Sequence, residues 1–255
     1  MSAPNDGPEA VLQPGVRTID NQKRFWDWHW QHWREHNVLN ERVVGRGNVV
    51  LSLLRSLPLV RPRILDFGCG MGWFTEQFAE LGPTTGIDLS TEALAIARAR
   101  CPHVTFIAGD VYRSPLPAAH FDVVVSQEVL ARVADQPRYL ERAADVLRPG
   151  GYLVLTTLNK FVVDRLGDAG SAPLPSELIE HFVDGRGLKG LLRPRFDVVR
   201  MTTHVPLGNA GILRLVNSSK LNRALGSVVS PRYLERLKEW AGFGYTLVAL
   251  ARKRS

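Results

Sequence analysis

The chain has few cysteines and no long apolar run. Two cysteines, Cys69 and Cys101, occur among its 255 residues. A disulfide framework is therefore excluded, and a reducing compartment is expected. No apolar run approaches the roughly 18 residues that a membrane-spanning helix needs. The first ten residues, MSAPNDGPEA, lack the basic and apolar regions of a signal peptide. The sequence predicts a soluble cytoplasmic protein.

Two common phosphate-binding motifs are also incomplete. Glycines are present in ILDFGCGMGWF, residues 64–74. A dinucleotide-binding G-x-G-x-x-G motif that begins at Gly68 requires glycine at position 73, where this chain has Trp73. A P-loop requires a following Gly-Lys-Ser/Thr, which is absent here. The spacing excludes both motifs but keeps a tight glycine turn that brings backbone N–H groups against another ligand.

Acidic residues are in the minority, and the basic excess is unevenly distributed. The chain carries 32 lysines and arginines against 25 acidic residues, a net charge of +7. Residues 160–255 hold 16 basic and 8 acidic residues, so the excess belongs to this part of the chain. Such a region attracts nucleic acid, an anionic substrate or an acidic membrane surface, or is simply a solvated basic face. Composition leaves these alternatives open.

Short apolar segments alternate with longer amphipathic ones through most of the chain. Helices are expected through the aromatic stretch after Asp20 and at 40–57, 72–81, 91–101, 137–147 and 176–192. Strands are expected at RILDFG, TTGIDLS, VTFIAGD, FDVVVSQE, GYLVLTTLN, FDVVRMTT and YTLVALAR. Strands that alternate with helices indicate βαβ units and a mostly parallel sheet.

Three acidic residues follow apolar segments where strands are expected to end. Asp66 precedes the glycines, Asp88 ends GIDLS, and Asp110 ends FIAGD. Open α/β sheets bind ligands in the crevice at the carboxyl ends of their strands, where these acids are predicted to converge. A carboxylate at Asp88 is suited to the two ribose hydroxyls of a nucleoside, and Asp110 to an adenine amino group. Each acid alone is more often a cap or turn residue, but the ordered set indicates a nucleoside site.

These residues resemble the successive motifs of class I S-adenosylmethionine-dependent methyltransferases. The resemblance runs from about residue 62 to residue 160, through ILDFGCGMG, GIDLS, AGD, FDVVVSQEVLARV and LRPGGYLVLTTLN. It implies S-adenosylmethionine as the cofactor. It also implies a role for each matching residue: Gly68, Cys69 and Gly70 at the methionine part, Asp88 at the ribose, Leu89 beside the adenine, Asp110 and Val111 at its edge, and Gln127 near the methyl-bearing end. Asp66 and Trp73 complete the expected cofactor-binding set.

The resemblance predicts an α/β fold. Its Rossmann-like sheet is expected to have seven strands, mostly parallel, with the last strand antiparallel. Residues 1–18 are expected to be disordered and residues 19–58 to form N-terminal lid helices. The core is expected at 59–206 and 241–255, with a helical insertion, 207–240, between the last two strands.

The chain is most similar to the ubiquinone-biosynthesis O-methyltransferases among the small-molecule enzymes of this class, but it departs from them after the fourth strand. Those enzymes usually show Glu-x-x-Glu-His, whereas this chain has Glu128-Val129-Leu130-Ala131-Arg132. The second acid and the histidine are missing, so no metal is expected. Glu128 and Arg132 are expected at the substrate, where Arg132 would attract an anionic group. The alternative for Arg132 is an exposed arginine on a helix without such a role.

If the methyl acceptor is a hydroxyl, its proton must be removed by a base other than the missing histidine. Histidine takes a proton near neutral pH, and we expect His181 to be the base, with His29 as the second candidate and His32 and His204 behind them. A packed or surface role remains the alternative for each.

The stretch FWDWHWQHWREH, residues 25–36, concentrates four of the six tryptophans. At about 100° per residue, Trp26, Trp30 and Trp33 share one stripe of a helix, beside a histidine edge formed by residues 29, 32 and 36. A zinc site is disfavoured because no acid or cysteine completes the histidine set. The resemblance implies a lid helix, with Trp30 at the cofactor, Trp28 or the histidine edge at the substrate, and Arg42 or Arg46 at the cofactor carboxylate.

The leading hypothesis is methyl transfer to a small hydrophobic or phenolic molecule, with oxygen favoured over nitrogen or carbon. An RNA or protein methyltransferase and a non-catalytic cofactor-binding protein are the alternatives. DNA is not an expected partner, and RNA is disfavoured because no RNA-binding module is recognisable and the basic residues are scattered. The segment 207–240 is expected to roof the substrate site, to touch a membrane surface transiently, or simply to pack on the domain.

Overall fold

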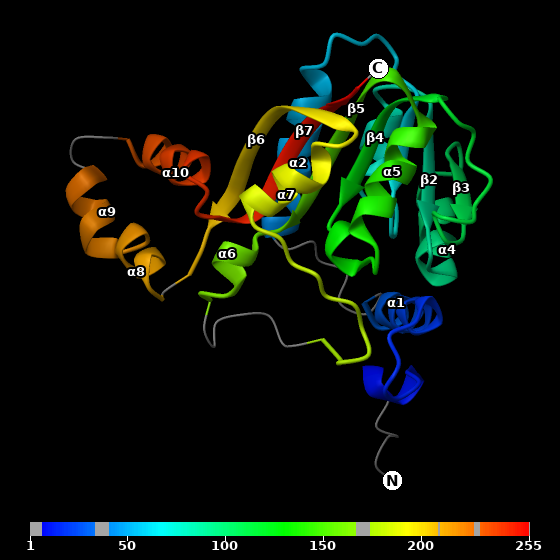
Figure 1. The fold of residues 1–255 in the computed structure, drawn as a ribbon, viewed down its shortest axis with the longest axis horizontal. Coiled ribbons are helices and arrows are strands. Elements are labelled where there is room, and N and C mark those ends of the chain that lie inside the picture. The colour runs from blue at the N-terminus through cyan, green and yellow to red at the C-terminus, as the bar shows by residue number, and fades with distance from the viewer. Residues whose placement is uncertain (1–6, 34–40, 167–173, 209, 227–229, 255) are drawn as a thin grey trace.

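A mixed sheet of seven strands forms the centre of the molecule in the computed structural model, which describes residues 7–33, 41–166, 174–208, 210–226 and 230–254 (Figure 1). The spatial order is β3-β2-β1-β4-β5-β7-β6. Strands β1 to β5 pair in parallel, and β7 is antiparallel to both β5 and β6. The predicted fold class is confirmed. The strands are β1 (Ile64–Phe67), β2 (Thr84–Asp88), β3 (Thr105–Ala108), β4 (Phe121–Gln127), β5 (Leu147–Leu158), β6 (Phe196–Pro206) and β7 (Gly244–Lys253).

Helices cover both faces of this sheet. On one face, α2 and α3 pack against apolar side chains of the central strands. On the other face, α5 and α7 pack against alternate residues of the same strands, and Figure 1 shows these two helices in front of the sheet. The helical elements in the described residues are η1 (Pro8–Val11), α1 (Ile19–Trp33), α2 (Glu41–Arg55), α3 (Thr75–Ala79), α4 (Thr91–Arg100), η2 (Leu130–Arg132), α5 (Gln136–Val146), α6 (Lys160–Val163), α7 (Gly185–Leu192), α8 (Ile212–Val216), α9 (Ser219–Gly226) and α10 (Pro231–Trp240).

The parallel register brings the predicted acids to one edge of the sheet. Asp66 lies opposite Gly86 of β2 and Val125 of β4, and Asp88 lies opposite Ala108 of β3. All four residues of β1 are buried, as expected for a strand covered on both faces. The strand ends that carry Asp66, Asp88 and Gln127 therefore open onto a common crevice.

Residues 7–18 precede α1 and belong to the range 1–18 for which composition predicts disorder. They contain η1, and their loop is tied to the start of α1. Asn21 is completely buried, and its side chain makes two hydrogen bonds with the backbone of Gln13. Its Oδ1 accepts from Gln13 N, and its Nδ2 donates to the Gln13 carbonyl. Its Nδ2 also donates to the Val16 carbonyl over 2.7 Å. A buried amide that satisfies several loop carbonyls and N–H groups fixes the loop without regular secondary structure.

The predicted helix over 176–192 is wrong in its first half. Only α7 (Gly185–Leu192) is helical, with the Asp184 carboxylate accepting from Gly187 N over 2.7 Å as its N-cap. Upstream, backbone groups bond neighbouring segments instead: Lys160 N donates to the Val183 carbonyl over 2.9 Å. Backbone groups used in this way are not available for a helix of their own.

Between β6 and β7 the described residues form α8, α9 and α10, which lie within the range 207–240 where a helical insertion is expected. These helices lie at the margin of the molecule beyond β6, at the far end of the sheet from α4 (Figure 1). Among the described residues no helix is long and apolar enough to cross a membrane.

Candidate active site

A cavity of about 410 Å³ lies at the carboxyl ends of β1, β2 and β4. The glycine loop after β1 forms its floor, and residues of α1 and α2 form its roof. The lining residues are Ile19, Gln22, Trp26, His29, Trp30, Val43, Arg46, Asp66, Gly68, Cys69, Gly70, Met71, Trp73, Phe74, Asp88, Leu89, Gly109, Asp110, Val111, Tyr112, Gln127, Glu128, Val129, Arg132, Val133 and Tyr139.

The glycine loop has room for backbone only. Gly68 adopts φ +92°, and a Cβ placed there would lie 2.2 Å from Val129 Cγ2. Gly70 also has a positive φ, +52°, and a Cβ there would lie 3.3 Å from Trp30 Cζ2. Glycine is the residue that adopts such a turn without strain. The loop therefore presents main-chain atoms to the cavity directly beneath the lid residue Trp30.

Asp88 is held in place by the loop on one side and by its own strand end on the other. Gly70 N donates to Asp88 Oδ2 over 2.8 Å, and Ser90 N donates to Oδ1 over 2.9 Å. Burial raises the pKa of Asp88, and these backbone hydrogen bonds oppose the rise. Because each carboxylate oxygen has more than one acceptor direction, both oxygens remain able to accept from ligand hydroxyls.

Asp66 is a buried carboxyl behind the glycine loop. Its side chain is almost fully enclosed, and Thr75 Oγ1 donates to Asp66 Oδ2 over 2.6 Å. Burial raises the pKa of Asp66 to about 7, the bond from Thr75 opposes the rise, and the nearby Asp88 adds to it. A positively charged ligand in the cavity favours the ionised form of such a group.

Asp110 turns the chain after β3. Its Oδ1 accepts from Tyr112 N over 3.0 Å, and its Oδ2 lies 3.9 Å from the exposed Arg113 guanidinium. Gly109 before it and Val111 after it both line the cavity. The loop after β3 thus closes the end of the cavity farthest from α2.

Unpaired polar atoms concentrate in the cavity wall. Among the described residues, buried side-chain atoms without a hydrogen-bond partner include Gln22 Nε2, Arg46 Nε, Trp73 Nε1 and Gln127 Oε1, and all four residues line the cavity. Buried polar groups in folded proteins are nearly always hydrogen-bonded, so such a set marks a place for a ligand. Three donors and one acceptor match a ligand that carries a carboxylate and an ammonium group, as the methionine end of S-adenosylmethionine does. The residues present therefore fit the cofactor that the motifs imply.

An ion-paired group lies after β4. Glu128 has φ +60°, a conformation that side chains other than glycine rarely adopt. Its Oε1 accepts from Thr156 Oγ1 over 3.0 Å and lies 3.9 Å from Arg46 Nη1. Burial raises the pKa of Glu128, while Arg46, Thr156 and Arg132 oppose the rise. Arg132 in turn pairs with Glu180, and both arginines line the cavity.

His29 lies in the roof, between aromatic rings. Its ring stacks on Phe25 at 5.9 Å between centroids and meets Trp26 edge-on at 5.3 Å. Burial lowers the pKa of His29. The imidazole is therefore neutral at pH 7 and available as a proton acceptor.

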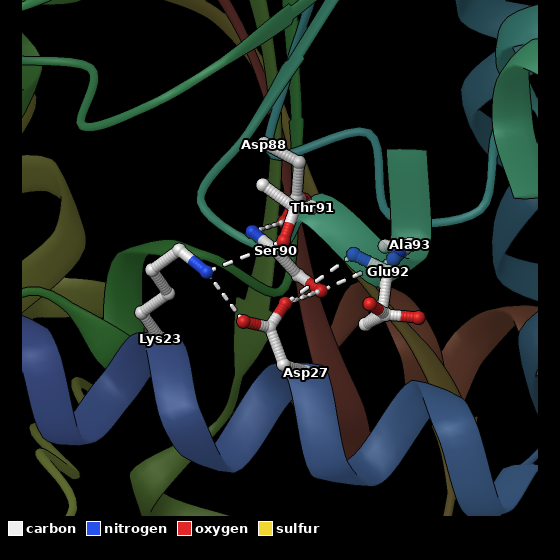
Figure 2. A network of polar contacts seen from close by, with 7 residues as sticks. All are labelled: Lys23, Asp27, Asp88, Ser90, Thr91, Glu92 and Ala93. Atoms are coloured by element: carbon white, nitrogen blue, oxygen red, sulfur yellow. Dashed lines mark hydrogen bonds and ion pairs between the residues drawn. The ribbon is translucent and has the colours of Figure 1, made fainter. Parts of the chain in front are cut away.

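The lid helix α1 is fastened to the N-terminus of α4 through Asp27 (Figure 2). Asp27 Oδ1 accepts from Ser90 Oγ over 2.6 Å and from Glu92 N over 3.3 Å. Asp27 Oδ2 accepts from Lys23 Nζ over 2.5 Å, and Lys23 also reaches Thr91 Oγ1. Burial raises the pKa of Asp27, but the hydrogen bonds from Lys23, Ser90 and Glu92 outweigh it, and the net shift is downward.

Three predicted residues lie outside the cavity lining. His181 is exposed, and its backbone is bonded to Ala131 and Gln136 in a segment, residues 174–184, that is irregular rather than helical. Trp28 faces away from the cavity and packs in a cluster with Leu12, Phe25 and Leu178. Arg42 is exposed at the first turn of α2, and Arg46, one turn further along, lines the cavity instead.

The other predicted residues line the cavity together. They are His29, Trp30, Asp66, Gly68, Cys69, Gly70, Trp73, Asp88, Leu89, Asp110, Val111, Gln127, Glu128 and Arg132. Trp26 lines it as well and also packs against the cluster of Leu12, Phe25 and Leu178. Position 36 of the histidine set lies outside the described residues, and nothing is described of the Trp33 side chain. No group of three histidine, cysteine or acidic side chains among the described residues is close enough to hold a metal ion.

Several lining residues were not predictable as such. Gln22 and Val43 carry no motif, and their contribution depends on how α1 and α2 dock. Tyr112 and Val133 follow strand ends by two or more residues, where loop conformation decides the direction of a side chain. A signal for Tyr112 was available, since it follows the predicted pair Asp110 and Val111 directly.

Comparison with known proteins agrees with this geometry. Residues 65–155 match the family described as methyltransferase domain. The malonyl-[acyl-carrier protein] O-methyltransferase of Serratia marcescens is 36% identical over 132 residues, which cover 51% of this chain and 48% of that protein. The ubiquinone biosynthesis O-methyltransferase of Vibrio cholerae is 29% identical over 223 residues, which cover 84% of this chain and 87% of that protein.

The fold has solved counterparts. The S-adenosylmethionine-dependent methyltransferase of Mesorhizobium loti superposes with a TM-score of 0.55 at 25% identity, and the match covers 79% of this chain and 95% of that one. The chain spans about half the length of the Serratia relative and of its mycobacterial relatives. The motifs, the sheet order and the matched domain lead to one assignment: residues 65–155 of this chain carry a methyltransferase domain of the class I S-adenosylmethionine-dependent type.

Proposed function

We propose that this protein transfers the methyl group of S-adenosylmethionine to an oxygen of a small hydrophobic molecule, with a phenolic hydroxyl as the preferred acceptor. The observation that carries the proposal is the composition of the cavity beyond the cofactor loop. Trp26, Trp30, Val43 and Val129 provide apolar and aromatic walls. The polar side chains beside these walls are few and include His29 in the roof and the ion pair of Glu128 with Arg46. Pockets of this kind suit apolar small molecules and use a few polar groups to orient them.

The cofactor contacts that the resemblance implies are supported by the place of these residues in the cavity lining. Asp88 would accept from the ribose hydroxyls, Leu89 would flank the adenine, and Asp110 with Val111 would lie at the adenine edge. Gln127 would accept from the amino group, and Arg46 would donate to the carboxylate in place of Arg42. When bound, S-adenosylmethionine supplies an electrophilic methyl group. Most of the protein's contribution to such an in-line displacement is to hold donor and acceptor close and aligned.

His29 is the proposed general base. A neutral imidazole in the cavity wall can take the proton of an acceptor hydroxyl, whereas His181, outside the cavity, cannot. Glu128 and Arg132 would contact polar substituents of the acceptor. The aromatic roof excludes water, so a developing oxyanion stays close to the methyl donor. No metal is invoked, because Ala131 and Arg132 replace the second acid and the histidine of the related motif.

The test is turnover on a panel of phenols, carboxylic acids, amines and RNA with labelled S-adenosylmethionine. We expect a methylated phenol, and we expect His29→Gln to lower turnover by at least about a hundredfold with cofactor affinity retained. His32→Gln is the matched control, since His32 lies on the same helix but is exposed. Methylation of carboxylic acids but not phenols would refute the phenolic preference. Full activity of His29→Gln would refute the role of His29 as the general base.

The alternatives are less well supported. RNA or protein methyl transfer rests on the basic charge alone, and that charge lies mainly in residues 160–255, away from the cavity lining. If the protein binds the cofactor without catalysis, calorimetry should show binding of S-adenosylmethionine, and no acceptor class should yield a methylated product. A cytoplasmic location, suggested by cysteine usage, stays a prediction.

A further inference from the structure

Helix α10 carries its apolar side chains on the outside. Tyr233, Leu237 and Trp240 recur at i, i+4 and i+7, the spacing of one helical face. Their relative exposures are 56%, 42% and 80%. None of the residues of α10 is buried. A surface helix of a globular protein ordinarily turns its apolar face toward the core, so this helix is inverted.

The inversion is fixed by polar contacts to β6. The Glu239 carbonyl accepts from Thr203 Oγ1 over 2.6 Å, and its carboxylate lies 3.0 Å from His204 Nδ1. Lys238 is the least exposed charged side chain of the helix at 11% and pairs with Glu235 over 2.7 Å. Polar residues therefore hold the inner side, and the apolar stripe is directed outward by these bonds.

Positive charge flanks the stripe. Arg232 and Arg236 are one turn apart on the same edge of it, and both are exposed. Across residues 207–240 six lysines and arginines stand against two glutamates. Helix α8 repeats the pattern on a smaller scale, with Ile212 at 49% and Leu215 at 66% exposure. Tyrosine and tryptophan with flanking arginines are the composition of helices that lie in a membrane interface.

We propose that α8 and α10 dock on an anionic lipid bilayer surface, with the Tyr233–Leu237–Trp240 stripe in the headgroup region and Arg232 and Arg236 at the phosphates. Charge complementarity favours anionic lipid. The amphipathic tyrosine and tryptophan suit the boundary between water and acyl chains better than a dry protein interface. Figure 1 shows these helices at the margin of the molecule.

The position of the surface relative to the cavity follows from strand direction. Because β6 and β5 are both antiparallel to β7, β6 runs in the same direction as the parallel strands. Its carboxyl end, where α8 to α10 begin, is therefore at the same edge of the sheet as the cavity. Docking itself does not depend on the proposed reaction.

The experiment is co-flotation of the full chain with vesicles of phosphatidylcholine alone or with phosphatidylglycerol added. We expect binding to the anionic vesicles at least about tenfold stronger than to the neutral ones, and reversal by salt. Arg232→Ala with Arg236→Ala should weaken anionic binding by about twenty-fivefold, from about fivefold per arginine. Trp240→Ala should weaken it by at least about tenfold.

Matched controls are Val60→Ala, an apolar side chain that is 93% exposed elsewhere, and Arg55→Ala at the end of α2. Both should bind as the wild type does, and thermal melts check that every variant is folded. Equal affinity for both vesicle types, or unchanged binding of the Trp240→Ala variant, overturns the proposal. A third outcome also overturns the proposal. If the protein does not bind vesicles but forms a concentration-dependent dimer that Trp240→Ala abolishes, the stripe contacts a second copy of the chain.

Discussion

Asp27 fastens the lid helix to the protein, so its removal should loosen the grip on the cofactor. In Asp27→Ala the Ser90 hydroxyl and the Glu92 N–H lose a charged acceptor, and Lys23 loses its partner. Hydrogen bonds to a charged group contribute about 1.5–3 kcal/mol. The Lys23 pair is 40% exposed on the lysine side and adds less than about 1 kcal/mol. The lid should therefore lose about 2 kcal/mol of docking free energy.

That loss becomes a change in affinity because the docked α1 supplies Trp26, His29 and Trp30 to the cavity. If the lid must dock for the cofactor to stay bound, about 2 kcal/mol raises its Kd about thirtyfold. The rise should appear mainly in the dissociation rate, because an undocked lid opens the exit path. Asp27→Asn keeps one acceptor for Ser90 and should fall between the two.

Calorimetry and stopped-flow tryptophan fluorescence with S-adenosylhomocysteine measure both quantities. Asp20→Ala is the matched control, an exposed acid on the first turn of the same helix, and it should bind as the wild type does. A Kd of Asp27→Ala within twofold of wild type would falsify the coupling between lid docking and cofactor retention. An equal loss in the control would show a general effect of charge on α1.

Two further predictions concern the floor of the cavity. Because the pKa of Asp66 is raised to about 7 by burial, a cationic cofactor that favours the carboxylate should bind more tightly as pH rises from 6 to 8, and Asp66→Asn should flatten this dependence in calorimetric titrations. The same raised pKa makes the unliganded fold lose stability as pH rises from the unfolded value of 3.8 through about 7, a loss that Asp66→Asn should remove in urea melts at pH 8. Gly68→Ala should abolish cofactor binding, since the new Cβ would lie 2.2 Å from Val129 Cγ2 at φ +92°, whereas Gly190→Ala, whose Cβ meets nothing within 4 Å, should bind normally.

The sheet and the cofactor loop were predictable because their signals are local. Strand periodicity and turn glycines identify β1 to β5 one segment at a time, and each predicted acid lies at or near the carboxyl end of its own strand. Parallel pairing then brings Asp66, Asp88 and Asp110 together without further information. The predicted fold class, family and cofactor of the family are confirmed.

The lid was predictable as an element but not in its orientation. Arg42 and Arg46 share a helical face, one turn apart, and only the docking of α2 decides which of them reaches the cavity. Trp28 and Trp30 lie on different faces of α1. The contacts of Asp27 with the start of α4, which is distant in the sequence, decide which of these faces is turned toward the cavity. The position of His181 outside the cavity lining was unpredictable for a similar reason. Lys160 and Ala131 take the backbone hydrogen bonds that a helix over 176–184 would need.

The walls of the cavity come from residues as far apart in the chain as Ile19 and Tyr139. Neighbouring parallel strands are joined only through long crossovers, so no short fragment of the domain contains the whole binding site. A ligand that binds such a site binds the assembled fold and nothing else. At one hundred times its Kd it adds about 2.7 kcal/mol to the free energy of unfolding. The cellular supply of the methyl donor would then govern how long the polypeptide survives proteolysis, as well as how fast it works.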